Sequence, residues 1–361
     1  MTFSRATILF AAVPVIALGA CGGGDGASGV DTDGGTKGDT SCDFAPCTDT
    51  RPPPGDAPPA DSPPGDTSPP PPGSGPSIGG CQVFPAANEW NRDVSGDAVD
   101  SNSASYIGAM NPTKALHPDW GSRTDNYGIP DIVVPDSQAK VPIVFDYADE
   151  SDPGPYPSPA DAPIEGGAGS GGDMHVLAVQ QGTCLLYEMF SSKKDATGPG
   201  WHAGSGAIWN LKTGALRPEG WTSADAAGLP IFPGLARADE TLDLKEIKHA
   251  LRFTVVNSQK AYIHPATHYA SSKTDPNLPP MGLRVRLKAS FDISKMSAPS
   301  QVIFRALKKY GMFVADNGSD WFVSGASDNA WTSTVMDGLV ADFRAVHGSD
   351  FEVVKTGAIV K

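Results

Sequence analysis

Beyond its first twenty residues, this 361-residue sequence has no long apolar run. No later segment approaches the ~20 consecutive apolar residues that a membrane-spanning helix needs. The sequence also lacks a nucleophile elbow, a P-loop, a dinucleotide-binding fingerprint and an HExxH motif. No Cys/His cluster has the spacing of a zinc site. We therefore expect no metal centre and no cofactor, and no catalytic assignment follows from a short motif.

Positive charge is scarce as well. Lys and Arg number 27 against 41 Asp and Glu, which gives a formal net charge of −14. Half of this acidity lies in residues 22–79, where nine aspartates face only Lys37 and Arg51. The rest of the chain is moderately acidic, which argues against nucleic acid as a partner.

The N-terminus carries one charge, Arg5, before an apolar run that ends at Leu18-Gly19-Ala20-Cys21. This pattern resembles a bacterial lipoprotein signal, in which the cysteine is acylated and becomes the mature N-terminus. We predict a signal peptide at 1–20, lipidation of Cys21 and an extracytoplasmic protein anchored at the outer membrane or cell surface. The alternative is a plain secretory signal with an incidental cysteine.

Residues 21–80 are predicted to form a disordered tether. Prolines and glycines make up 26 of the 58 residues at 22–79, and large apolar side chains are almost absent. Such a segment cannot bury enough surface to offset its ordering entropy. Residues 81–361 are long enough for a single globular domain with a sizeable core.

With Cys21 reserved for lipid, four of the five cysteines remain. An envelope location permits disulfides, and four cysteines allow three pairings. We favour Cys42 with Cys47, which are close in the tether, and Cys81 with Cys184, which lie at the edges of the folded part.

Short apolar runs bounded by turn formers predict about ten strands and two helices. Hairpins are expected from 251–256 with 261–263, from 175–179 with 184–190, and from the runs that flank Asn317-Gly318. A short capped helical turn is expected at 221–228. No strand–helix alternation is sustained, so we predict a mostly β domain, a β-sandwich or jelly-roll-like fold with two peripheral helices and long loops. The seven tryptophans are interpreted as packing residues rather than sugar platforms.

The stretch 249–293 gathers the most candidate chemistry, including three of the seven histidines. At 283–288 apolar and basic residues alternate, which places Arg284, Arg286 and Lys288 on one face of a strand. Cations aligned in this way are unfavourable unless something anionic compensates them. We consider two sources, a bound acidic ligand and acidic neighbours on adjacent strands.

Two catalytic schemes fit these residues. Cleavage of a uronic acid polymer by elimination needs cations near the substrate carboxylate and a base, for which we consider His249, His268 and Tyr269. Hydrolysis needs two carboxylates, with Glu188 and either Asp149 or Glu150 as candidates. The alternative for His249 is a structural histidine with a buried partner, and the alternative for the acidic loop is solvation or weak calcium binding.

Several stretches together resemble a family of secreted or lipid-anchored bacterial proteins. They are Phe84-Pro85 with Asn88 and Trp90-Asn91, YADESDPG at 147–154, WTSADAAGLP at 221–230, HALRF at 249–253 and ADNG at 315–318. The signal and tether are similar to those of myxobacterial lipoproteins. The resemblance implies export and a single domain over 81–361, and it implies no activity.

Two functions of different class follow. The first is an envelope-anchored lipoprotein whose domain acts on polysaccharide as a hydrolase or lyase. The second is a non-catalytic surface domain that binds a glycan or a neighbouring protein. Both have a membrane contact through the lipid, and both leave the oligomeric state open.

Overall fold

A computed structural model describes residues 75–361. The expected signal peptide, Cys21 and the Cys42–Cys47 pair lie outside the described residues. The first described element is β1 (Ser77–Ile78), which pairs with β2 (Cys81–Gln82) at the expected start of the domain, residue 81. No helix within 75–361 combines the length and the apolar character that crossing a membrane requires.

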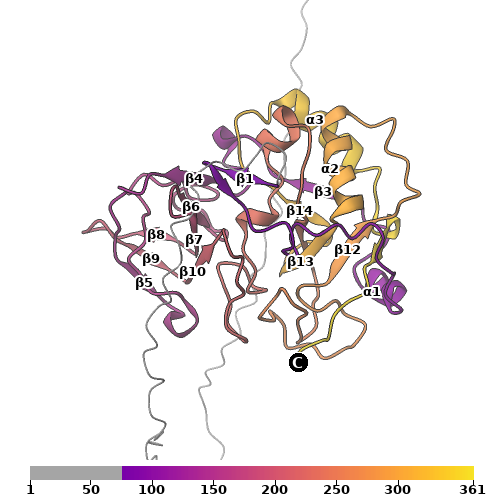
Figure 1. The fold of residues 1–361 in the computed structure, drawn as a ribbon, viewed down its shortest axis with the longest axis horizontal. Coiled ribbons are helices and arrows are strands. Elements are labelled where there is room, and N and C mark those ends of the chain that lie inside the picture. The colour runs from indigo at the N-terminus through magenta and orange to yellow at the C-terminus, as the bar shows by residue number, and fades with distance from the viewer. Residues whose placement is uncertain (1–74) are drawn as a thin grey trace, which may run out of the picture. The chain divides into compact units, whose positions relative to one another are not determined.

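The prediction of a β-rich fold is confirmed. Besides β1 and β2, the described residues form three sheets, which Figure 1 shows as two groups. One group holds a four-stranded sheet in the order β10 (Ser205–Asn210), β7 (Leu185–Phe190), β6 (Val176–Gln180), β4 (Asp131–Val134), and a three-stranded sheet in the order β5 (Ile143–Phe145), β9 (Trp201–Ala203), β8 (Lys193–Lys194). A sandwich or jelly-roll arrangement stays a prediction.

The other group contains a six-stranded mixed sheet. Its order is β15 (Phe351–Val353), β12 (Arg284–Leu287), β13 (Met312–Asn317), β11 (Leu251–Val255), β14 (Phe322–Ser324) and β3 (His117–Asp119). β11 and β13 are parallel, so their carboxyl ends meet at one edge of the sheet. That edge carries the candidate site described below.

One expected hairpin is confirmed, because β6 and β7 pair antiparallel from Val176 with Met189 to Gln180 with Leu185. The prediction of a hairpin at Asn317-Gly318 is wrong, since β11 lies between β13 and β14. The backbone of the turn bonds to β11 instead, with Gly318 N donating to Val255 O and Trp321 N to Thr254 O.

The hairpin expected between 251–256 and 261–263 is also wrong. Both edges of β11 are already occupied by β13 and β14. The later run pairs elsewhere, with Tyr262 N donating to Val360 O and Ile263 N to Met281 O.

Three α-helices occur in the part of the chain that the structure describes: α1 (Ser103–Ala109), α2 (Ala298–Lys309) and α3 (Ser333–Phe343). The last two are the expected pair. Ser297 caps α2, as predicted, by accepting a hydrogen bond from Ser300 N. The two helices pack on each other through Phe304 and Phe343, whose ring centroids lie 5.0 Å apart. Single helical turns connect other elements: η1 (Arg123–Asp125), η2 (Ala148–Glu150), η3 (Phe232–Gly234), the π-turn η4 (Asp239–Asp243) and η5 (Gly348–Asp350).

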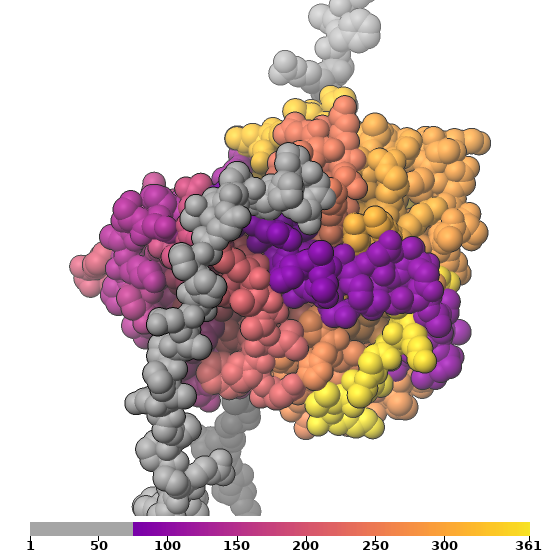
Figure 2. All heavy atoms as spheres, in the orientation of Figure 1, coloured from indigo at the N-terminus to yellow at the C-terminus, as the bar shows by residue number. Residues whose placement is uncertain are grey.

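The Cys81–Cys184 disulfide is confirmed, with 5.5 Å between the two Cα atoms. It joins β2 to the turn between β6 and β7. Figure 2 shows the N-terminal part of the described chain, in indigo and purple, lying across later segments of the fold. Trp90, Trp120, Trp201, Trp209, Trp321 and Trp331 are buried, while Trp221 is half-buried. Packing therefore accounts for most of the tryptophans.

Candidate functional site

A cavity of about 280 Å³ lies beside the carboxyl end of β13. Its lining includes three carboxylates, Asp173, Asp225 and Asp316, together with His268, Tyr147 and Phe190. Its volume lies near the lower end for small-molecule sites, and its charged lining is unusually acidic for such a site. Because these residues come from distant segments, we take the cavity as the candidate functional site of the described chain.

A β-bulge places Asp316. Phe253 on β11 pairs with Val314, but the next residue, Thr254, pairs with Asp316, so Ala315 is the extra residue on β13. The carbonyl oxygen of Ala315 is thereby free to accept a hydrogen bond from Ala227 N at 3.1 Å. A bulge commonly redirects a neighbouring side chain. Here it joins β13 to the loop that carries the second carboxylate.

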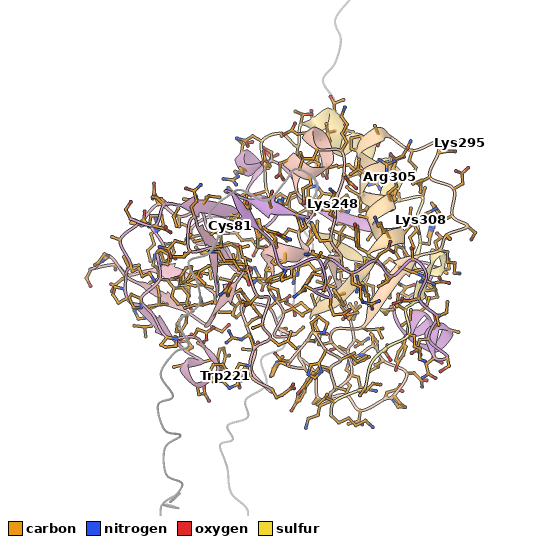
Figure 3. All side chains as sticks on the ribbon, viewed as in Figure 1. Cys81, Trp221, Lys248, Lys295, Arg305 and Lys308 are labelled. Carbon is orange, nitrogen blue, oxygen red and sulfur yellow. A yellow bond between two sulfur atoms is a disulfide. The ribbon has the colours of Figure 1, made fainter. Side chains whose placement is uncertain are left out.

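That loop is the segment 221–230, and the prediction of a helical turn there is wrong. Ser223 Oγ accepts a hydrogen bond from Asp225 N at 2.9 Å and lies 2.6 Å from Leu229 O. Such side-chain bonds to the backbone compete with helix formation. The carbonyl oxygen of Ala227 further accepts from Thr267 N and His268 N. The loop is therefore fixed on both sides, although Trp221 at its start lies at the edge of the fold in Figure 3.

Asp225 forms a buried ion pair. Arg252 on β11 reaches the loop, with 2.8 Å between Nη2 and Asp225 Oδ1, and its Nη1 donates to Ser324 Oγ on β14 at 2.7 Å. Asp225 is 1% exposed and Arg252 3%. Asp225 Oδ2 has no hydrogen-bond partner among the described residues. One oxygen of this carboxylate is thus held by the fold, and the other is buried without a hydrogen-bond partner among the described residues.

His175 supports the same loop from the other side. Its Nδ1 lies 2.6 Å from Glu165 Oε2, and its Nε2 lies 3.1 Å from Ala224 O. Burial opposes a charge on His175, but the carboxylate of Glu165 outweighs burial and raises the pKa to about 9. The imidazolium therefore donates from both nitrogens at neutral pH, and the residue before Asp225 is anchored.

Asp225 in the loop and Asp316 on β13 have different electrostatic environments. Burial raises the pKa of Asp316 to about 7, and the charge of Asp225 adds to the rise. Burial also raises the pKa of Asp225, but the guanidinium of Arg252 opposes this rise through direct contact. Asp316 has no such contact with a cation among residues 75–361, so the two carboxyl groups differ in their direct partners, although burial raises the pKa of both.

Of the predicted catalytic residues, His268 lines the cavity. Its Nδ1 lies 2.9 Å from Ala226 O, which fixes the tautomer with Nδ1 as donor and leaves Nε2 as an acceptor. Tyr269 stacks on the His268 ring with a centroid distance of 5.3 Å, and Lys260 lies over the Tyr269 ring. His268 and Tyr269 therefore lie together, and of the two only His268 lines the cavity.

Glu188 lies elsewhere, fully buried on β7. Its carboxylate accepts hydrogen bonds from Trp209 Nε1, Ile231 N and Phe232 N, at 2.8–3.0 Å. Burial raises the pKa of Glu188 to about 7 despite these donors. The carboxylate joins β7 and β10 to the start of η3, and these contacts favour a structural role.

His249 is also buried and forms part of a charged cluster outside the cavity. Its Nε2 lies 3.0 Å from Glu240 Oε2, and Arg237 Nη2 lies 3.1 Å from Glu240 Oε1. Its Nδ1 lies 2.8 Å from Ala250 O. Each ring nitrogen has a partner within the fold, as the structural alternative for His249 expects.

The three predicted substrate-binding cations also bond to the fold. Arg284 donates to the carbonyl oxygens of Tyr310, Glu89 and Arg92. Arg286 pairs with Glu352 on the adjacent strand β15 at 2.8 Å. Lys288 Nζ donates to Ser349 O at 2.8 Å. Glu352 is the acidic neighbour on an adjacent strand that the alternative expects for Arg286, whereas Arg284 and Lys288 are held mainly by backbone carbonyl oxygens.

The acidic loop lies close to the cavity without supplying its carboxylates. Tyr147 lines the cavity and is 57% exposed. Glu150 Oε2 accepts a hydrogen bond from Thr222 N at 3.1 Å, which ties η2 to the loop 221–230. Asp149 is exposed. Nowhere in 75–361 do three His, Cys, Asp or Glu side chains form a group able to hold a metal ion.

Asp173, Asp225 and Asp316 were not among the residues expected from the sequence. A signal exists for Asp225 and Asp316 only: four of the stretches quoted for the resemblance, at 147–154, 221–230, 249–253 and 315–318, supply Tyr147, Asp225, Arg252 and Asp316 to the cavity or its wall. Asp173 lies outside these stretches. Comparison of the chain with protein-family models, with curated proteins and with solved structures finds no match.

Proposed function

We propose that the domain hydrolyses a glycosidic bond of an envelope or environmental polysaccharide in the cavity beside β13, and that the chain is held at the envelope through a lipid on Cys21. The observation that carries the proposal is that two carboxyl groups with different partners line one cavity, Asp225 in contact with Arg252 and Asp316 without a contacting cation in the described chain. Glycoside hydrolysis needs one carboxyl group protonated and a second ionised. We assign the protonated role to Asp316, whose pKa is raised to about 7, and the ionised role to Asp225, which contacts Arg252.

In this scheme Asp316 is the general acid. It donates its proton to the leaving glycosidic oxygen as the bond to the anomeric carbon breaks. Asp225 is the ionised partner that attacks the anomeric carbon or removes a proton from an attacking water, with Arg252 keeping it charged. His268 Nε2 is an acceptor for a sugar hydroxyl, and the exposed ring of Tyr147 offers a face for the sugar.

Hydrolysis is supported over elimination by the placement of charge. Elimination beside a uronate needs cations at the substrate carboxylate. Arg284, Arg286 and Lys288 use their nitrogens within the fold, and the cavity is lined by carboxylates instead. An acidic cavity stabilises a cationic transition state, which is the charge that develops at the sugar during hydrolysis.

The test uses the full chain, a panel of neutral, amino and acidic polysaccharides, and an assay for released reducing ends. Asp316→Asn and Asp225→Asn should each lower kcat by about 10²–10⁴-fold while substrate binding changes only severalfold, because proton transfer acts in the transition state. Asp337→Asn on α3, which is exposed, is the matched control and should match wild type. Binding without turnover of any polysaccharide would favour the non-catalytic glycan-binding domain. Unchanged turnover in Asp316→Asn would exclude the assigned roles.

A further inference from the structure

The charge of the cavity constrains its ligand. Asp173, Asp225 and Asp316 all line it, and no lysine or arginine is among its described lining residues. Arg252 lies behind Asp225 and balances one of the three carboxylates. Even with a proton on Asp316, the cavity presents a net negative charge to whatever enters it.

Two of these carboxylates also have unused acceptor capacity. Asp225 Oδ2 is buried and has no hydrogen-bond partner among the described residues, although a buried carboxylate oxygen is normally paired. The exposed side chain of Asp173 makes no hydrogen bond or ion pair within 75–361. A ligand that enters the cavity therefore meets one deep and one outer acceptor, and each is suited to a charged donor.

We propose that the sugar bound in this cavity carries a protonated amino group, which pairs with Asp173 in the cavity that also holds the unpaired Oδ2 of Asp225. An ammonium group supplies three donors and one positive charge, which matches unpaired carboxylates better than a hydroxyl does. Tyr147 and Phe190 add aromatic rings at the same cavity, and such rings attract cations. A uronate, in contrast, would bring a fourth carboxylate into the site. This inference rests on the proposed glycan function and names its substrate class.

The experiment measures equilibrium binding of methyl glycosides to the full chain by calorimetry at about pH 6 and low salt. The probes are glucosamine, glucose and glucuronate glycosides in both anomeric forms. The glucosamine glycoside should bind about tenfold more tightly than the glucose glycoside, and the glucuronate should bind most weakly. This preference should shrink as salt is added, because the outer pair is solvent-exposed.

Asp173→Asn should reduce the preference for glucosamine over glucose to about twofold, while the affinity for glucose is unchanged. Asp337→Asn, remote on α3, should leave both affinities as in wild type. Equal binding of glucosamine and glucose, or a preference for glucosamine that persists in Asp173→Asn, would overturn the inference while leaving the hydrolase proposal in place. A glucosamine preference without cleavage of any amino-sugar oligomer would support the inference and overturn the hydrolase.

Discussion

Arg252 Nη2 and Asp225 Oδ1 lie 2.8 Å apart in the interior, and this ion pair joins the six-stranded sheet to the loop 221–230. Arg252 also reaches Ser324 on β14, so one guanidinium connects two strands and the loop. Removing two charges from water is costly, and direct contact offsets that cost only while both partners are present. The pair therefore defines where Asp225 sits in the cavity and makes the loop dependent on the sheet.

Arg252→Met should lower the free energy of unfolding by about 3–5 kcal/mol, because Asp225 is left as a buried and uncompensated charge. The double variant Arg252→Met/Asp225→Asn removes that charge as well and should be more stable than the single variant. Chemical denaturation of both proteins measures the difference. If the double variant is the less stable of the two, then the pair is not energetically coupled in this way.

His175 should make stability depend on pH. Its pKa in the fold, about 9, lies above the value of about 6.5 for an unfolded histidine. The contribution is therefore fully present below about pH 6.5 and is lost as the pH rises through about 9, with a total of roughly 3 kcal/mol. In His175→Gln the decline in unfolding free energy over this window should largely disappear. His202→Gln on β9, at an exposed position, is the control and should keep the decline. A wild-type protein whose stability is flat from pH 6 to 9 would contradict the charge assigned to His175.

The sequence predicted the elements better than their partners. The alternation at 283–288 correctly gave β12, and the capping serine and apolar spacing correctly gave α2, because these signals are local. The hairpin predicted at Asn317-Gly318 does not form because β11, about sixty residues earlier in the chain, lies between β13 and β14. It takes the hydrogen bonds that the hairpin would use. Local turn chemistry carries no information about a strand inserted from elsewhere.

The same limit applies to the site. His268 was among the expected residues because histidine chemistry is visible in a sequence, and it does line the cavity. In the sequence Asp225 and Asp316 are ordinary aspartates near turn formers, and only the bulge at Ala315 and the ion pair with Arg252 bring them to one cavity. The alternation at 283–288 correctly aligned Arg284 with Arg286 on one face. It could not show that segment 89–94 and β15 supply the hydrogen-bond acceptors for these two side chains.

Glu188 provides a separate test of buried hydrogen bonding. Oε1 accepts from Ile231 N and Phe232 N, and Oε2 accepts from Trp209 Nε1. Glu188→Gln keeps one acceptor oxygen but sets an NH₂ group against the Trp209 N–H, so we expect a loss of about 1–3 kcal/mol in unfolding free energy. Adding Trp209→Phe removes the opposed donor but also leaves space. The double variant should therefore lose less than the sum of the two single variants. Simple additivity in denaturant unfolding would show that the Glu188–Trp209 contact is not the source of the loss.

The last prediction concerns the protonation of Asp316, and it can be read without a substrate. The pKa of Asp316 is raised to about 7 by burial and by the charges of Asp225 and Asp173, while Arg252 opposes the rise. Asp173→Asn removes one of the raising charges at an exposed position, so the pKa of Asp316 should fall below 7 with little change in stability. Carboxyl NMR titration of the full chain measures this shift, and Asp337→Asn should leave the titration unchanged. If Asp316 is the general acid, then kcat/KM must fall as the pH rises through the pKa measured on the free protein, and in Asp173→Asn that fall must move to lower pH by the same amount. A titration that moves while the rate profile stays fixed would separate Asp316 from the chemistry and leave it as a buried, protonated neighbour of Asp225.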